Sequence, residues 1–516
     1  MQQEKLRVKV RSWEGETVNV EDENGAAFTL ALGKDHAYLS KILTDACTLQ
    51  LIGSGLRAGV LHPRHIIFEP DYLVDVTTVA RCFDLISENP MHNLLRKIKD
   101  FEATPATLLG NYAGALLDEE VHGRAEDGDS LGRFLRDNAV EALSCLDEAG
   151  LKKLKADGLS QRSNIHQMLF KDLPRQAAAY RPDRVLLEPS FFSPILGLQG
   201  RMDFFQQDGR VLIEQKSGKV ANDYQLGRPG VRKQASKEHA VQLQLYRALL
   251  QYGYGVDGKK MDSFLLYSKY PDGLLRCEED EDLLQRALGM RNRLVRYEMH
   301  YRDGGMPELL EEYVRCPEKI CDENLRGGKF WAAFKAPEYE KLFAPLRNAS
   351  PLEKAYFYRF MTFLSREHWY GKMEPVRFAS AAVKRDEGEL YDGLTLALPP
   401  EGPVTTLRFC SSSRGASVPP ANFRLGDVVV AYAYDGEPSP YRSVVFRGTL
   451  SAIEEDTLTV CLRDAQGNPS VFDTNRRWAL EHDYIESSVN ALYRGLTLLL
   501  DAPKARRDWL LMQQKP

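Results

Sequence analysis

The hydrophobic periodicity of the chain changes several times along its 516 residues, and this feature constrains the fold most. Apolar and polar residues alternate from about 5 to 75, as in LRVKVRSW and FTLALG, which is typical of strands with one buried face. From about 88 to 185, apolar residues recur three and four positions apart, which indicates helices. We therefore expect a small β-barrel followed by a helical region, and three or four domains in a chain of this length.

The middle of the chain predicts an α/β unit. Two strands, GLQGRMDFF and RVLIEQK, flank the turn-forming pair Asp208 and Gly209, which predicts a hairpin. A helix, KEHAVQLQLYRALLQYG, and a strand, SFLLYSK, follow. Helices are expected as far as about 370, including LEKAYFYRFMTFLSREHWY, whose aromatic stripe is expected to pack against another helix. After a Ser/Gly/Pro-rich linker around 411–422, renewed alternation predicts a second small barrel.

Composition narrows the class of protein. The sequence contains no apolar run of about 18 residues, and its start, MQQEKLRVKV, lacks the apolar stretch of a signal peptide. The 8 cysteines show no paired spacing, which favours a reducing compartment. We expect a cytoplasmic protein of bacterial type, associated with the nucleoid and not with a membrane. The net charge of −5 argues against a wholly basic nucleic-acid coat but is compatible with a basic groove.

Three residues of the hairpin predict a metal-binding catalytic site. Asp203 ends GRMD, and Glu214 and Lys216 lie two residues apart, so that their side chains share one face of the sheet. Two carboxylates on adjacent strands suit Mg²⁺ or Mn²⁺, and a lysine beside them can orient water or offset charge on a phosphate. A solvated salt-bridge cluster is the common alternative for such a motif.

The following helix adds residues to this candidate site. Gln242 and Tyr246 lie four apart on one helical face, with His239 on nearly the same face, and can reach back toward the sheet. Taken singly, each is more often an ordinary polar helix residue.

The loop between the second strand and this helix is basic. It is either a solvated charge run or a clamp for single-stranded nucleic acid, with an aromatic residue for base stacking. The candidate DNA-binding residues here, together with His239, are Lys219, Tyr224, Arg228, Arg232, Lys233 and Lys237.

The segments GRMD, EQK and HAVQLQLY resemble the active-site segments of RecB-like PD-(D/E)XK nucleases, most closely those of the DNA-replication helicase/nuclease family that trims flaps. Glu188 with SPILGLQGRMD, IIFEPDYLVDVTTVARCF, and RLGDVVVAYAY with WALEHDY extend the likeness over nearly the whole chain. The resemblance implies metal binding by Asp203 and Glu214, catalysis by Lys216, and support or DNA contact by Gln242 and Tyr246. It also implies single-stranded DNA threaded through a tunnel.

Two departures from the family pattern bear on the site. Gly114, in LLGNYAG, stands where the family usually has a metal-binding histidine; Asp118 and Glu119 could substitute, although acids on a helix are more often solvated. Many relatives also hold a four-iron cluster. Cys82 matches its first position, but Cys316 and Cys321 lack the close pairing that a cluster favours, so none is expected.

These observations predict an α/β, restriction-endonuclease-like (PD-(D/E)XK) core with flanking domains. The expected divisions are an OB-like barrel at 1–85, the nuclease domain at 86–335, a helical stalk at 336–385, a helicase-associated type of barrel at 386–490, and a C-terminal helix at 491–516. GYGVDGKK ends in lysine where a P-loop has Ser or Thr, and it follows a helix, so no ATP site is expected. The resemblance implies a helicase motor, either in cis just after residue 516 or in trans; the alternative is a chain whose motor has been lost. The rival hypothesis is a single-stranded DNA-binding platform with a decayed nuclease site.

Overall fold

The N-terminal alternation forms a barrel. The computed structural model describes residues 3–100, 102–123, 129–377, 380–399, 402–411, 421–483 and 486–514, so most of the 411–422 linker lies outside the described residues. Strand β1 pairs with both β2 and β4, and β3 pairs with β5, which closes a ring of five strands that β6 extends. The strands are β1 Gln3–Glu14, β2 Thr17–Asp22, β3 Ala27–Ala31, β4 Thr48–Arg57, β5 Val60–His62 and β6 His65–Phe68. Helix α1, Gly33–His36, follows β3. The expected first barrel is confirmed.

A mixed five-stranded sheet lies at the centre, in the order β14-β13-β12-β11-β8. Only β12 and β13 run parallel. The strands are β8 Val185–Leu187, β11 Phe204–Gln206, β12 Val211–Lys216, β13 Asp262–Tyr267 and β14 Leu274–Arg276. The expected hairpin is β11–β12, with Gly209 in the left-handed region at its turn (φ +74°), a conformation that favours glycine.

Alternation along β12 separates two cores, because successive side chains point to opposite faces. Leu212 packs in the core that contains Val241 and Leu245 of α9, Lys237–Ala248. Ile213 packs in the core on the other face. Helices α4, Pro105–Val121, and α7, Glu148–Gln167, contribute to that second core. Glu214 and Lys216 therefore share the α9 face of the sheet. The short helices α5 Ser130–Asp137, α6 Ala139–Cys145 and α8 Leu173–Gln176 flank α4 and α7.

A second small sheet interrupts the expected first strand. GLQGRMDFF was expected to be one strand, but it is two: β10, Leu198–Arg201, pairs with β9, Ser190–Ser193, and with β7, Val74–Asp75, whereas β11 belongs to the central sheet. The chain bends between the two strands at Met202 and Asp203. The hydrophobic pattern is continuous through this bend because Met202 and Phe204, on either side of Asp203, are both buried, so periodicity could not reveal it.

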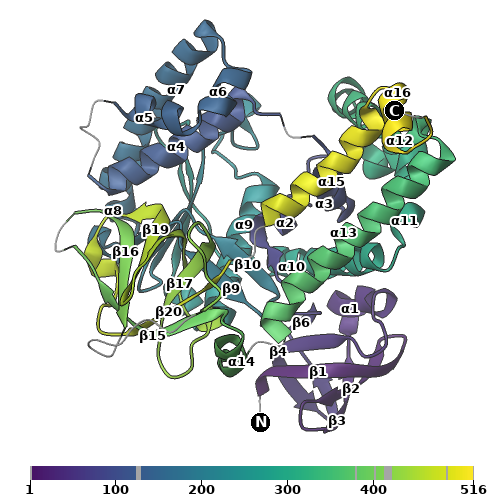
Figure 1. The fold of residues 1–516 in the computed structure, drawn as a ribbon, viewed down its shortest axis with the longest axis horizontal. Helices are drawn as coiled ribbons and strands as arrows, with labels where there is room; N and C mark the ends of the chain where they lie inside the picture. The colour runs from purple at the N-terminus through teal and green to yellow at the C-terminus, as the bar shows by residue number, and fades with distance from the viewer. Residues whose placement is uncertain are drawn as a thin grey trace.

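Helices fill the remaining part of the structure; α11, α12, α13, α15 and α16 lie to the right in Figure 1, whereas α14 lies beside the second barrel. The helices are α2 Val76–Ala80, α3 Met91–Ile98, α10 Glu281–Arg302, α11 Met306–Arg315, α12 Ala336–Asn348, α13 Pro351–Arg377, α14 Ala381–Asp386, α15 Glu486–Asp501 and α16 Lys504–Leu510. The aromatic stripe of α13 packs against other helices, as expected. Phe357 lies in a core with Tyr301 of α10 and Tyr493 of α15, and Trp369 is also buried, whereas Phe360, Phe363 and Tyr370 are exposed.

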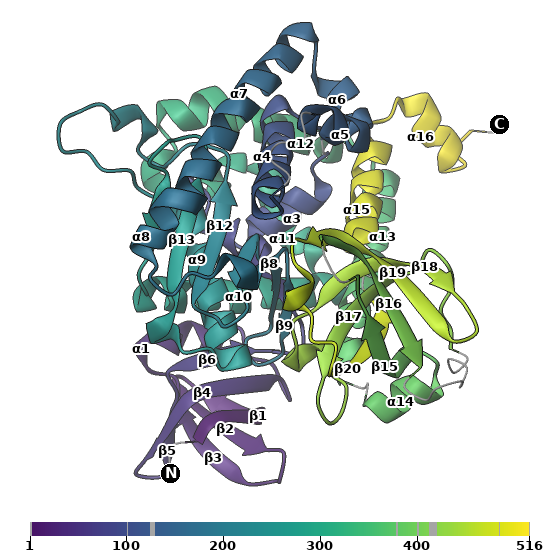
Figure 2. The ribbon, with the colours of Figure 1, turned by 90° about the vertical axis from the view of Figure 1, so that its left-hand side faces the viewer.

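The second alternating region closes into a barrel, in the order β15-β16-β19-β18-β17-β20, and β20 pairs back to β15. Its strands are β15 Leu390–Ala397, β16 Val404–Ser411, β17 Val428–Tyr434, β18 Phe446–Ile453, β19 Thr457–Gln466 and β20 Arg477–His482. The expected second barrel is confirmed. Figure 2 shows it beside the central sheet, at a distance from the N-terminal barrel.

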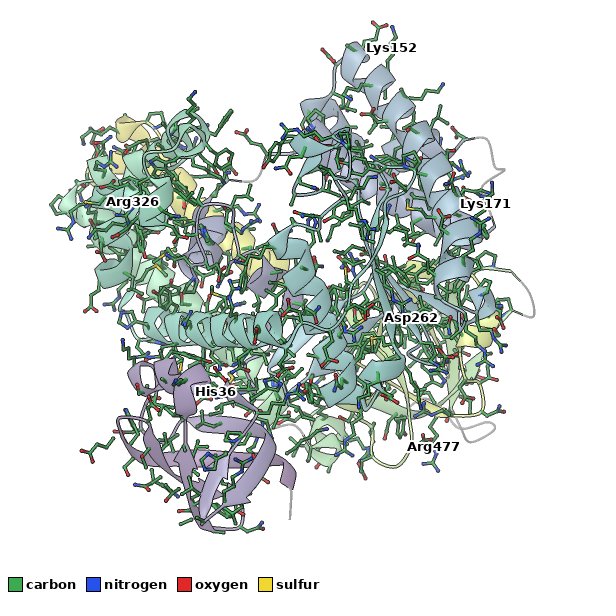
Figure 3. All side chains as sticks on the ribbon, turned by 180° about the vertical axis from the view of Figure 1, so that it is seen from behind. His36, Lys152, Lys171, Asp262, Arg326 and Arg477 are labelled. Atoms are coloured by element: carbon green, nitrogen blue, oxygen red, sulfur yellow. The ribbon has the colours of Figure 1, made fainter. Side chains whose placement is uncertain are left out.

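Arg291 connects the N-terminal barrel to the central part of the fold through hydrogen bonds. Arg291 of α10 is fully buried and donates to the carbonyl oxygens of Phe68, Glu69, Tyr72 and Gly197. The first three carbonyls lie where the chain leaves the barrel, and the fourth precedes β10, so this side chain joins three parts of the fold. Viewed from behind, Figure 3 shows this barrel, marked by His36, at the end of the molecule opposite the tip of α7, marked by Lys152. Within the described residues, no helix combines the length and apolar character needed to cross a membrane.

Candidate active site

The bend between β10 and β11 places Asp203 beside β12. Its Oδ2 accepts a hydrogen bond from the backbone nitrogen of Gln215 at 2.6 Å. Glu214 and Lys216 flank Gln215 on the strand, so the three residues that the sequence singled out are together at the end of the hairpin. Burial raises the pKa of the Asp203 carboxyl above its ordinary value.

Glu214 is a buried carboxylate with one oxygen held and the other without a partner. The residue is 3% exposed, and Oε1 accepts from Lys216 at 2.8 Å and from Gln242 at 2.6 Å. Oε2 is also buried, but has no hydrogen-bond partner among the described residues. Burial and then the negative charge of Asp203 raise the pKa of Glu214 to about 7. An unsatisfied buried carboxylate oxygen is costly, and this one is suited to bind a cation.

Lys216 is held in place from two sides. Its ammonium donates to Glu214 Oε1 and, at 2.9 Å, to the side-chain oxygen of Gln242. Burial opposes its charged form, but the carboxylates of Glu214 and Asp203 outweigh that effect and raise the pKa of Lys216. It is therefore a fixed positive charge beside the two acids.

Helix α9 supports this cluster as its spacing predicted. Gln242 bridges Glu214 and Lys216, and Tyr246, four residues on, donates from its hydroxyl to the carbonyl oxygen of Arg201 at 2.6 Å. Tyr246 is 1% exposed, so it supports the backbone that leads to Asp203 and does not present a surface for DNA.

His239 lies at the start of α9, where its Nδ1 contacts the hydroxyl of Tyr267 at 2.7 Å. Burial, with a smaller contribution from Lys216, lowers the pKa of His239 to about 3. The ring is therefore neutral near pH 7. A neutral ring contributes no positive charge for phosphates, and the assignment of His239 to DNA binding stays a prediction.

An arginine that the sequence analysis overlooked ends β10. Arg201 Nε lies 2.8 Å from Glu188 Oε2, and its Nη1 lies 3.3 Å from Oδ2 of Asp464, which is carried by β19 of the second barrel. Glu188 has positive φ (+51°), and burial followed by the charge of Asp203 raises its pKa to about 9. The position of Arg201 two residues before Asp203 could have drawn attention to it, but no local signal marks Asp464.

Helix α4 brings another carboxylate to the same region. Burial, then the charges of Asp464 and Asp203, raise the pKa of Asp118 well above its ordinary value. Asp118 is thus close to the site and is not the solvated acid that helix statistics favoured. Glu119 instead contacts Ser130 and Arg133 in a structural network. At Gly114, one turn before Asp118, an added Cβ would meet no heavy atom within 4 Å.

The basic loop contains both paired and unpaired charges. Lys219 pairs with Asp223, Lys233 with Asp272 and Lys237 with Glu88. In contrast, Arg228 and Arg232 are exposed and make no ion pair among the described residues. Tyr224 is 77% exposed. Only part of the loop is therefore available to contact a nucleic acid without breaking an ion pair.

The donor set fits a hard divalent cation with few protein ligands. Asp203 and Glu214 supply carboxylate oxygens, one of them the unpartnered Glu214 Oε2. Among the described residues, no three His, Cys, Asp or Glu side chains converge closely enough to form a metal cluster by themselves. Mg²⁺ is commonly bound by one or two carboxylates, with water and substrate phosphate completing its shell, so two ligands suffice.

The comparisons with known proteins leave the family open. No protein-family model matches the chain, and no curated sequence matches it. One similar solved structure is the crystal structure of a "Putative exonuclease" from Eubacterium rectale, with a TM-score of 0.29 and 13% identity over 46% of this chain and 83% of that one. The function of this chain is therefore argued from its own residues.

The P-loop-like segment GYGVDGKK and the cysteines considered for an iron cluster are not part of the Asp203 and Glu214 site. GYGVDGKK occupies the end of the α9 region, a loop and the short 3-10 helix Gly258–Lys260 before β13, which is not the strand–loop–helix order of a P-loop. Cys82 is buried, as is Cys321, and the lack of an iron cluster stays a prediction.

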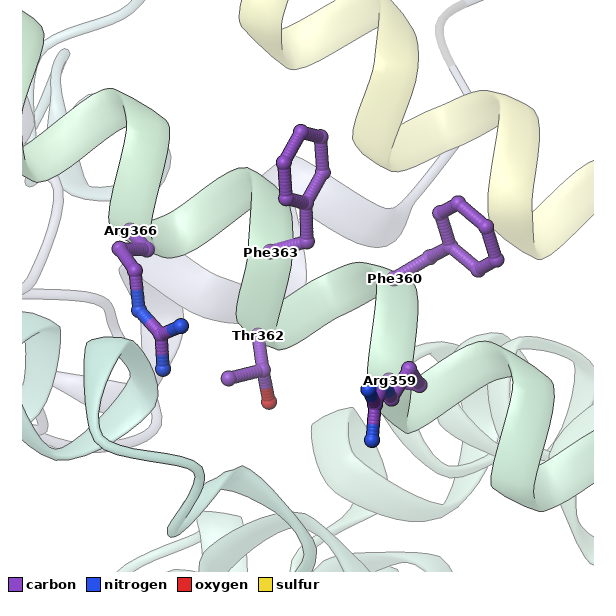
Figure 4. A pocket seen from close by; sticks show the side chains of 5 residues that line it. All are labelled: Arg359, Phe360, Thr362, Phe363 and Arg366. Atoms are coloured by element: carbon purple, nitrogen blue, oxygen red, sulfur yellow. The ribbon is translucent and has the colours of Figure 1, made fainter.

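Two hollows are also separate from the site. One of about 920 Å³ lies between the N-terminal barrel and α10. Another, of about 530 Å³, lies along α13. Figure 4 shows Phe360 and Phe363 on one side of that helix and Arg359 and Arg366 on the other. Neither hollow is lined by Asp203, Glu214 or Lys216.

Proposed function

We propose that this chain is a metal-dependent nuclease that hydrolyses phosphodiester bonds of single-stranded DNA, at flaps or ends. The observation that carries the proposal is Glu214. It is buried with one oxygen fixed by Lys216 and Gln242 and the other without a partner, next to Asp203. A salt bridge with Lys216 alone would not explain the orphaned oxygen, because buried polar atoms normally have partners.

The proposed fold of the central region is that of PD-(D/E)XK nucleases, with an OB-like barrel before it and a helicase-associated type of barrel after it. The arrangement of Asp203, Glu214 and Lys216 around one hairpin supports this proposal, as do Gln242 and Tyr246 on the next helix. A helicase motor, in cis or in trans, and a cytoplasmic location are parts of the same proposal.

Each residue of the proposed active site has a different role in phosphodiester hydrolysis. Asp203 and Glu214 would hold Mg²⁺ or Mn²⁺, and Gln242 fixes the orientation of the Glu214 carboxylate through Oε1. Such an ion, when bound, supplies Lewis acidity at the scissile phosphate and lowers the pKa of water. Lys216 directs its ammonium to the same place, where it can orient the attacking water or stabilise the negative charge that grows on the phosphate.

Single-stranded DNA is proposed as the substrate because of the loop that follows β12. Arg228 and Arg232 offer unpaired positive charge for phosphates, and Tyr224 offers an exposed ring for base stacking. Residues 217–236 join β12, which ends at Lys216, to α9, which carries Gln242, so the loop begins and ends beside the proposed catalytic groups.

The test compares cleavage with binding in one Mg²⁺ buffer. Glu214→Ala is expected to reduce cleavage of labelled single-stranded DNA by orders of magnitude but to change affinity little, because affinity comes from basic and aromatic contacts. Lys216→Ala is expected to abolish cutting while leaving metal binding nearly intact. If the wild type cuts with neither Mg²⁺ nor Mn²⁺ yet binds single strands as tightly as both variants, the binding platform with a decayed site replaces the nuclease.

A further inference from the structure

The bend that positions Asp203 is held by the segment just before β9. The backbone nitrogen of Met202 donates to the carbonyl of Pro189 at 3.1 Å, and that of Glu188 donates to the carbonyl of Asp203 at 3.2 Å. Any displacement of Glu188 and Pro189 would therefore move the proposed metal ligand as well. The positive φ of Glu188 shows that this segment adopts a conformation that L-residues rarely favour, so it requires contacts from its surroundings.

The second barrel supplies those contacts on both sides of the segment. The Gln466 side chain, on β19, accepts from the nitrogen of Leu187 at 3.0 Å and donates to its carbonyl oxygen at 2.8 Å. Val445 and Ser190 exchange two backbone hydrogen bonds, each of 3.0 Å. The segment from Leu187 to Ser190 is thus clamped by a domain whose sequence lies more than 250 residues away.

Asp464 of the second barrel contacts the residue that leads into the bend at Asp203. Asp464 lies two residues before Gln466 on β19 and contacts the Arg201 guanidinium, which contacts Glu188 on its other side. Arg201 lies at the end of β10, where its carbonyl oxygen accepts from Tyr246. The ion pairs and this hydrogen bond fix both the side chain and the backbone of the residue from which the chain bends to Asp203.

We propose that Asp464, carried by the second barrel, is a positioning residue of the Asp203 site and acts through Arg201. The second barrel is then a structural part of the active site and not merely a neighbouring domain. The inference rests on the proposed function for its effect on metal binding, but its effect on the bend is independent of that function.

The first test measures Mn²⁺ binding, by calorimetry, and the rate of single-strand cleavage. Asp464→Ala is expected to weaken Mn²⁺ binding by roughly 10–100-fold, the usual effect of losing a residue that orients a metal ligand. Asp464→Asn, which keeps the size and one acceptor oxygen, should recover part of this loss. Glu454→Gln is the matched control, because Glu454 is an exposed acid of the same barrel that pairs only loosely with Arg408, at 3.7 Å. Equal Mn²⁺ affinity in the wild type and Asp464→Ala would overturn the proposal.

A double-mutant comparison tests the route through Arg201. If Asp464 acts through Arg201, adding Asp464→Ala to Arg201→Ala should cause no further loss of Mn²⁺ affinity. A further loss as large as that in the wild-type background would show that Asp464 acts directly or through another residue, and would overturn the assignment.

Amide hydrogen exchange separates this inference from the proposed function. In Asp464→Ala the amides of Glu188 and Met202 should exchange faster than in the wild type, whereas those of Ser190 and Val445, which report docking of the barrel, should stay protected. Unchanged exchange at Glu188 and Met202, or loss of protection at all four amides, would overturn the positioning role. If the wild type neither binds Mn²⁺ nor cuts DNA, the proposed function fails, and this comparison still decides the role of Asp464.

Discussion

Gln242 Nε2 donates to Glu214 Oε1 at 2.6 Å, and this hydrogen bond joins helix α9 to the edge of the proposed metal site. The oxygen of the same amide accepts from Lys216 at 2.9 Å. Gln242 therefore fixes the relative positions of a carboxylate and an ammonium, which otherwise would be set only by their mutual attraction.

We expect Gln242→Ala to reduce cleavage by about 10–100-fold, because an unsupported ligand loses its orientation. Gln242→Glu should reduce cleavage further, because it places a negative charge beside Glu214 and removes the amide N–H that donates to Glu214 Oε1. The measurement is the Mn²⁺ dependence of the cleavage rate. Gln244→Ala is the control on the same helix, because its side chain contacts the carbonyl of Glu278 and not the site. Equal rates in wild type and Gln242→Ala would contradict this prediction.

The stability of the metal-free protein should depend on the protonation of Glu214. Its folded-state pKa, about 7, lies above the ordinary 4.5 because of burial, so the stability contributed by the protonated form is fully present below pH 4.5 and is lost as pH rises through 7. A cation removes this penalty by binding the carboxylate. Mn²⁺ should therefore raise the melting temperature at pH 8 and have little effect at pH 5.

Thermal melts in Mn²⁺ and in a chelator at both pH values test this expectation. Glu214→Ala should lose the Mn²⁺-dependent gain at pH 8. A gain of the same size at pH 5 and pH 8 in the wild type would show that the ion binds elsewhere.

The basic loop should contribute to DNA affinity through its unpaired arginines. Replacing Arg228 and Arg232 with alanine is expected to weaken binding of single-stranded DNA and to reduce the slope of log K against log salt by about 1.4, or roughly 0.7 per charge. Lys259 and Lys260, replaced together, are the matched control: they remove the same charge, but precede β13, at the opposite end of the parallel β12–β13 pair from Lys216. Equal slopes for the two double variants would exclude a specific role for the loop.

Arg291 should stabilise the folded protein without contributing to catalysis. Replacement by alanine leaves four carbonyl groups without this donor, two of them at Phe68 and Gly197, and is expected to cost about 3 kcal/mol or more. Arg293→Ala is the control, because that side chain is exposed on the same helix and only covers the ring of Tyr38. Urea titration measures both. Similar midpoints for the two variants would show that the N-terminal barrel is held mainly by other contacts.

The features that could be predicted from the sequence are those that one short stretch determines. Alternation predicted both barrels, and the spacing of Glu214, Lys216, Gln242 and Tyr246 predicted that they would meet, because two residues along a strand and four along a helix each return to the same face. The prediction of one strand across Asp203 is wrong, because Met202 and Phe204 keep the apolar pattern through the bend at which the chain changes sheets.

Long-range contacts have no signal in the local sequence. Asp118 was judged by the statistics of helix surfaces, which do not contain the positions of Asp203 and Asp464. The pairing of Arg201 with Asp464 spans 263 residues and has no local signature. The neutral state of His239 follows from burial beside Tyr267, which depends on how α9 packs on β13.

The separation of Arg201 and Asp464 along the chain also has a consequence for biosynthesis. At translation rates of about 5–20 residues per second, Asp464 emerges from the ribosome roughly 13–50 s after Arg201. During that interval the nascent chain already carries Asp203, Glu214 and Lys216 but lacks the barrel that clamps the bend. Asp203 would therefore be held in its final position only after the second barrel has been synthesised and has docked, well after the central hairpin has been made.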